Sequence, residues 1–152
     1  TQRISLGAAV QNLFGVDSRP QWDPIQIDNA MPLGPAGRIH INLRDWSKFT
    51  MAIATNDSAS LKVTPEVLQT LLTPTLTASG DQPYAGGWIV FQRPEIRDSG
   101  YYHNGSNTTW YAYAVVIPAQ QTSILVATNA FHSNAMRACD AVARDLAGWR
   151  QP

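Results

Sequence analysis

Two apolar segments near the end of the chain, residues 110–117 and 122–128, constrain the fold most. Both are rich in β-branched and aromatic residues, which favour strands. Only Pro118–Gln121 connects them, and so short a connection requires the two strands to pair antiparallel. The first segment, WYAYAVVI, does not alternate polar with apolar residues, so both of its faces should be covered. The covering layers must then be helices.

Three other segments carry the periodicity of amphipathic helices, and two of them begin on recognisable N-cap residues, Asn42 and Thr64. The segments are residues 42–55, 64–72 and 133–149. WIVFQ at 88–92 is a further apolar run and is typical of a strand. The sequence therefore predicts an α+β fold in which an antiparallel sheet is flanked by helices.

The first 37 residues have a different character. Residues 1–15 show approximately helical spacing of apolar residues, and Gly15 could cap a helix there. Residues 16–37 contain several prolines and no sustained period, which indicates a connecting loop. We therefore divide the chain into 1–37, a helix plus a proline-rich connecting segment, and 38–152, which holds the sheet and the remaining helices.

Composition excludes several classes of partner. A formal net charge of +0 and a pI of about 6.7 supply no basic field, so nucleic acid and anionic lipid are not expected. No apolar run approaches the roughly 20 residues of a transmembrane helix, and the first residues do not resemble a signal peptide.

Cys139 is the single cysteine, and no Cys and His cluster has metal-ligand spacing, so we expect neither a disulfide nor a metal or other cofactor.

Polar residues gather in two stretches, His103–Thr109 before the predicted hairpin and Asn129–Arg137 after it. The entry and the exit of an antiparallel hairpin lie at the same end of the sheet. Five side chains could therefore face one cleft: His103, Asn104, Ser106, Asn129 and Asn134. The last helix would also present its N-terminal N–H groups to this cleft, which favours an anion there.

Gly105 has two interpretations. A glycine at a strand entrance lets a ligand or another backbone approach closely. Alternatively, Gly105 marks a β-bulge, His103 is an ordinary surface residue, and Ser133 or Asn134 only caps the last helix. Spacing alone leaves both interpretations open.

Several stretches, taken in order, resemble a known family. They are GPAGRIHINLRDWSKF, TPEVLQTLLTP, YAGGW, YYHNGSNTTWYAYAVVIP and ILVATN, followed by the terminal helix. From about Gly34 onward, the chain resembles the C-terminal part of the serine β-lactamase and penicillin-binding-protein family. The most similar branch contains class C β-lactamases, D,D-peptidases and related esterases.

The resemblance implies roles for HNGS. The third active-site motif of the family is Lys-Thr-Gly or His-x-Gly on a strand that lines the cleft. His103 stands at the Lys position, Asn104 at the Thr position and Gly105 at the Gly position. The backbone N–H of Ser106 would complete the oxyanion hole for acyl transfer on an amide or ester.

The resemblance also implies a substrate carboxylate site at the start of the last helix. Asn134 and Arg137 stand at the positions of an Asn and an Arg that help to place this carboxylate. Phe131 departs from the polar residue usually found nearby.

The family nucleophile lies in Ser-x-x-Lys, which this sequence lacks: Asp45 and Ala59 stand three residues before Lys48 and Lys62. The triplet Tyr102-His103-Asn104 matches the second motif, Tyr-x-Asn, only formally, because it overlaps the third motif. We therefore expect the chain alone to be inactive.

Its expected partner is the N-terminal part of the same hydrolase, missing here or a separate chain. Without that part, an exposed apolar surface should lead to self-association. By resemblance, the substrate is a small amide or ester or a peptidoglycan-like compound, and the location is periplasmic or secreted.

Two other functions fit the residues. One is a non-catalytic binding or structural module that keeps the family fold. The other is a self-cleaved hydrolase in which Thr1 is the nucleophile.

Overall fold

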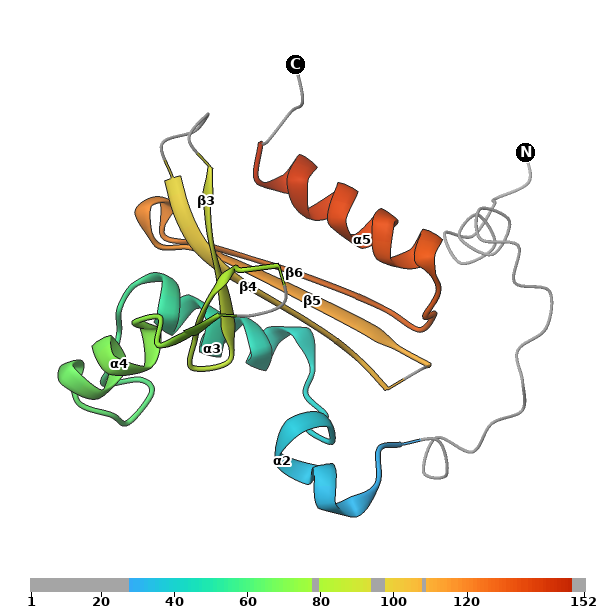
Figure 1. Ribbon diagram of the computed structural model, residues 1–152, viewed down its shortest axis with the longest axis horizontal. Helices are drawn as coiled ribbons and strands as arrows, with labels where there is room; N and C mark the ends of the chain where they lie inside the picture. The colour runs from blue at the N-terminus through green and yellow to red at the C-terminus, as the bar shows by residue number, and fades with distance from the viewer. Residues whose placement is uncertain (1–27, 78–79, 94–97, 108, 149–152) are drawn as a thin grey trace.

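The computed structural model describes residues 28–77, 80–93, 98–107 and 109–148 of the chain (Figure 1). The helical elements are η1 (Met31–Leu33), α2 (Gly34–Gly37), α3 (Leu43–Ala54), α4 (Pro65–Leu72), η3 (Pro118–Gln120) and α5 (Ser133–Leu146). The strands are β1 (Leu76–Thr77), β2 (Pro83–Ala85), β3 (Trp88–Arg93), β4 (Asp98–Ser106), β5 (Tyr111–Ile117) and β6 (Thr122–Thr128). Helices and strands therefore occupy separate stretches of the chain, and the predicted α+β class is confirmed.

The six strands form one sheet in the order β1-β2-β3-β4-β5-β6, and every neighbouring pair is antiparallel. The predicted hairpin is confirmed, because β5 and β6 pair along their whole length. Its connection consists of η3 and Gln121, which adopts a left-handed conformation with φ 48°. The strand predicted at 88–92 is β3.

HNGS was expected at the entrance of the strand that is β5. Instead, these residues end a separate strand, β4, which pairs with β5 across a short turn. β4 is rich in small and polar residues and lacks the apolar runs of its neighbours, so composition did not identify it as a strand. Ser106 pairs with Tyr111, which in turn pairs with Thr128, so HNGS still lies at the sheet end where β6 finishes.

Two helices cover opposite faces of the sheet, as Figure 1 shows for α3 and α5. On the α3 face, Ala114 and Val116 of β5 pack with Ile53 of α3. On the α5 face, Val115 and Ile117 pack with Ala143. Successive residues of β5 thus enter two different cores, and the expectation that this strand is covered on both faces is confirmed.

The helices begin where local chemistry can satisfy their first N–H groups. The Asp45 N–H donates to Asn42 Oδ1 over 2.9 Å, and the Val67 N–H donates to Thr64 Oγ1 over 3.3 Å. Both predicted caps are confirmed.

The capping residue of α5 is His132, and the suggestion that Ser133 or Asn134 caps it is wrong. The Ala135 N–H donates to His132 Nδ1 over 3.3 Å. Ser133 and Asn134 cannot take this role, because they already belong to the first helical turn.

Part of the N-terminal prediction lies outside the described residues, including the helix expected at 1–15. Residues 31–37, which we expected in a loop, form the short helical turns η1 and α2. Pro32 and Pro35 stand near the start of these turns, where a missing backbone N–H costs nothing. The division of the chain at residue 37 remains a prediction.

Within the described residues, no helix has the length and apolar character needed to cross a bilayer.

Candidate active site

β4 continues past the point where its antiparallel neighbour β3 begins. The ladder between these strands runs from the pair Ile89–Tyr102 to the pair Arg93–Asp98. His103–Ser106 lies beyond this ladder and pairs with β5. The four residues that the sequence singled out therefore form a strand end, with β5 on one side and the beginning of β3 next to His103 on the other.

The strand is regular at Gly105, so the β-bulge interpretation is wrong. Asn104, Gly105 and Ser106 pair in unbroken register with successive residues of β5. A Cβ added at Gly105 would meet no atom within 4 Å. Neither backbone strain nor close packing requires a glycine here, and open space lies over the strand at this point.

The pleat of β4 separates the predicted site residues between the two faces of the sheet. Asn104 shares the α5 face with its cross-strand partner Tyr113. His103 and Gly105 alternate with it and belong to the other face. His103 is exposed. Asn129 lies near Trp110 in a third hollow. The expectation that all five polar side chains face one cleft is therefore wrong.

On the α5 face, a cavity of about 530 Å³ lies between the sheet and α5, and we call it the α5 cavity. Its polar lining comes mainly from Tyr102, Asn104, Tyr111, Tyr113, Arg137, Asp140 and Arg144. The Tyr102 hydroxyl donates to Gln82 Oε1 over 2.9 Å. Burial, and then the nearby Asp140 carboxylate, raise the pKa of Tyr113 to about 12. The Tyr113 hydroxyl therefore stays protonated at neutral pH.

Asn134 and Arg137 lie in the first turns of α5, where an Arg137 guanidinium N–H donates to Asn134 Oδ1. Both residues are exposed. Arg137 lines the α5 cavity together with Asn104, so the structure brings these two predicted site residues together. It does not bring either of them to the face that holds His103 and Gly105.

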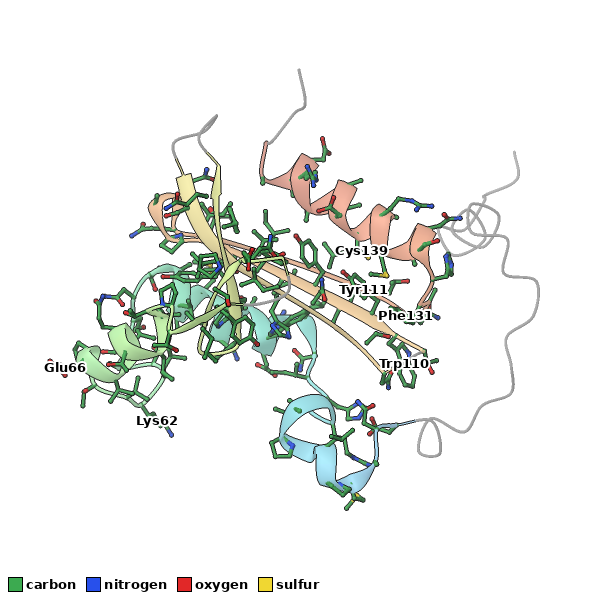
Figure 2. The ribbon with its side chains drawn as sticks, in the orientation of Figure 1. Lys62, Glu66, Trp110, Tyr111, Phe131 and Cys139 are labelled. Atoms are coloured by element: carbon green, nitrogen blue, oxygen red, sulfur yellow. The ribbon has the colours of Figure 1, made fainter. Side chains whose placement is uncertain are left out.

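A second cavity, of about 390 Å³, lies between the η1–α2 segment and the ends of β4 and β5, and we call it the α2 cavity. Gly105 and Ser106 form one wall, and Trp110 lies beside them. Figure 2 shows Trp110 at this end of the sheet, on the side of α2. Asp28 and His40 line the opposite wall.

Asp28 and His40 form a pair that no motif in the sequence indicated. The His40 Nε2 and Asp28 Oδ2 atoms are 3.0 Å apart, and the Asp28 side chain is only 7% exposed. The hydrogen bond to His40 is the main cause that lowers the pKa of Asp28 below its ordinary value. Twelve residues separate the two side chains, so no short motif could have revealed the contact.

Comparison with known proteins identifies the family. A model of the family described as Beta-lactamase matches residues 7–148. This chain belongs to the Beta-lactamase family. Comparisons with curated proteins and with solved structures found no match. The resemblance deduced from the motifs is thereby confirmed, and membership of the family indicates a hydrolase-like module.

The lysines of this β-lactamase-family chain do not supply a nucleophile motif. Lys48 Nζ lies 2.6 Å from Asp45 Oδ1, where a Ser-x-x-Lys motif would have its serine. Lys62 is preceded by Ala59 at that position. Among the described residues there is also no group of three His, Cys, Asp or Glu side chains that could hold a metal ion.

Proposed function

We propose that this chain supplies one wall of the acyl-transfer site of a serine hydrolase of the β-lactamase and penicillin-binding-protein type. The observation that carries the proposal is the end of β4, where HNGS extends past β3 and open space lies over Gly105. A substrate acyl group can approach the backbone there without displacing a side chain. Family membership makes this strand end the natural candidate for the third active-site motif.

Each residue of the motif has a proposed role. The Ser106 N–H stabilises the oxyanion that develops during acyl transfer, an effect on the order of 3 kcal/mol. Gly105 keeps the approach open, and His103 contacts the substrate or exchanges a proton in the cleft. Asn104 acts from the α5 face, where it lies near Arg137.

In this proposal, Arg137 and Asn134 bind a substrate carboxylate that reaches around the end of β4 to the α5 face, since they do not share the face of His103 and Gly105. A guanidinium group has five N–H donors, and the contact with Asn134 leaves others for a carboxylate. The exposure of both residues allows a ligand to reach them.

The nucleophile comes from a partner, the N-terminal part of the same hydrolase. The chain alone has no catalytic activity. Large apolar side chains that the described surface exposes support such a partner. The most exposed are Met31, Ile39, Leu76 and Leu146, with between 64% and 77% of their surface accessible. We propose a small amide or ester, or a peptidoglycan-like compound, as substrate, and a periplasmic or secreted location.

Reconstitution tests the proposal. The codons before Thr1 are sequenced, and a segment that carries Ser-x-x-Lys and Tyr-x-Asn is expressed together with this chain. Hydrolysis of a β-lactam or an activated ester should appear only in the combined protein. Mass spectrometry of the chain alone should show no acyl adduct, and an adduct there would contradict the proposal.

A pair of variants then locates the site. Gly105→Leu should lower the rate of the combined protein on the order of 100-fold, because it blocks access to the oxyanion N–H. Ala119→Leu adds bulk at the exposed turn that connects β5 and β6, and it should leave the rate unchanged. Equal rates in both variants would remove Gly105 from the site.

The second candidate is the non-catalytic module, which is favoured by the absence of Ser-x-x-Lys from the printed sequence. Sequencing the codons before Thr1 tests this candidate as well. If neither missing motif is encoded there, the hydrolase proposal fails and the module remains.

A further inference from the structure

The contact between Asp28 and His40 determines which atom of the His40 ring can serve a ligand. A carboxylate can only accept hydrogen bonds, so Nε2 is the donor in the contact with Asp28 Oδ2. When the ring carries one proton, this contact places it on Nε2 and leaves Nδ1 as an acceptor. Within the described part of the chain, the ring makes no other hydrogen bond, and 71% of the side chain is exposed.

His40 lies at a junction of two hollows at the end of the sheet. It lines the α2 cavity, whose opposite wall contains Gly105 and Ser106. It also lines the neighbouring hollow beside Trp110 and Asn129. A group bound over Gly105 therefore lies in the same cavity that His40 lines.

The rest of the α2 cavity is suited to an apolar group. Its apolar lining consists of Leu33, Ala36, Ile39, Trp110 and Ala112. A volume of about 390 Å³ accommodates a benzyl-sized substituent. Apolar walls with a few directed polar atoms are typical of small-molecule sites.

We infer that the α2 cavity is a substrate subsite, in which the apolar substituent of an amide is buried and His40 Nδ1 accepts a hydrogen bond from the amide N–H. The inference deepens the proposed function and rests on it only for regarding the ligand as a substrate. An ester has an oxygen in place of the N–H, so it leaves Nδ1 without this bond. The subsite therefore selects amides over esters.

In this arrangement Asp28 positions the His40 ring. This role has to be distinguished from a second one, in which Asp28 only stabilises the α2 segment. Arg38 Nε lies 3.5 Å from Asp28 Oδ2, and an Arg38 guanidinium N–H also donates to the Asn29 carbonyl. Asn29 Nδ2 donates to the Gly37 carbonyl over 2.8 Å. This network holds the α2 segment in place, so the test needs a readout that loop stability alone would not change.

The test measures binding of N-benzylacetamide and benzyl acetate to the 152-residue chain by NMR. These two probes differ only in N–H against O. The amide should bind about two- to tenfold more tightly, the range expected of one neutral hydrogen bond. The backbone amides of Gly105, Ser106 and Trp110 should shift with both probes. Equal affinities, or binding that does not shift these amides, would overturn the inference.

Variants assign the preference to the acceptor atom. His40→Leu should make the two affinities equal, and His40→Gln, which keeps an acceptor oxygen, should restore part of the difference. Gln69→Leu, an exposed change in α4, should leave the preference intact. A preference that survives in His40→Leu would overturn the role of His40.

The tautomer of the ring provides the readout for Asp28. Nitrogen-15 spectra of the three histidines should show His40 with its proton on Nε2, and Asp28→Ala should remove this bias while the His132 signal stays unchanged. An unchanged His40 tautomer in Asp28→Ala would overturn the positioning role. Because no turnover is measured, failure of the hydrolase proposal in the combined protein leaves these results unaffected.

Discussion

Asn104 and Gly105 are neighbours in the chain, yet they line different cavities on opposite faces of the sheet. The separation follows from the pleat of β4, in which successive side chains alternate between faces. A substitution at Asn104 therefore acts on the tyrosine-rich surface under α5. A substitution at Gly105 acts on the surface that faces α2.

Replacing Gly86 or Gly105 by alanine should have different effects on the free energy of unfolding. Gly86 has φ +50°, and a Cβ there would lie 2.3 Å from the Leu71 carbonyl oxygen, so Gly86→Ala should lower the free energy of unfolding by about 1–3 kcal/mol. Gly105→Ala should change it by less than about 0.5 kcal/mol, because nothing lies within reach. Urea unfolding followed by tryptophan fluorescence measures both. A larger loss at Gly105 would mean that the space over the strand is filled.

His132 should matter for stability through its cap. His132→Ala removes the acceptor of the Ala135 N–H and should cost about 1 kcal/mol of unfolding free energy. His132→Asn offers another cap oxygen and should recover most of the loss. Thermal denaturation compares the three proteins, and equal stability of the alanine variant would show that the cap contributes nothing.

Tyr113 should make stability depend on alkaline pH. Its pKa is about 12 in the folded chain, compared with about 10 for an unperturbed tyrosine. A raised pKa of this kind contributes stability that is complete below pH 10 and is lost as the pH rises toward 12, since the unfolded chain ionises first. Chemical denaturation at several pH values should show this decline. In Tyr113→Phe the decline should be weaker, and an unchanged decline would place its origin elsewhere.

The chain should associate when it is alone. Leu76 on the first strand and Leu146 at the end of α5 are among the large apolar residues left exposed. Light scattering coupled to gel filtration should give a mass above the 16.7 kDa of one chain. Co-expression with the upstream segment should abolish the self-association. A stable monomer on its own would contradict the prediction that these surfaces need a partner.

The sequence predicted those parts of the fold that depend on local chemistry. The β5–β6 hairpin followed from two apolar runs and a short connection, and the starts of α3 and α4 followed from Asn42 and Thr64. β4 was missed as a separate strand, because its pairing with β3 and β5 decides its conformation and its composition does not. β1 and β2 are too short to leave a periodic pattern.

In the candidate site, too, the features that depend on tertiary structure could not be predicted from the sequence. Residue types and order indicated His103–Ser106, but the face on which each side chain lies depends on the strand register, which the sequence did not reveal. The contact between Asp28 and His40 depends on how the η1–α2 segment folds back on itself. Tertiary structure alone brings such residues together.

The order of the strands also affects how this sheet can form. Each strand pairs with the next one along the chain, so every ladder can close over a short loop. The entropic cost of forming such contacts is small, and pairing can proceed from one end of the sheet to the other. As the chain leaves the ribosome, β1 to β6 can therefore pair in order, before α5 has emerged.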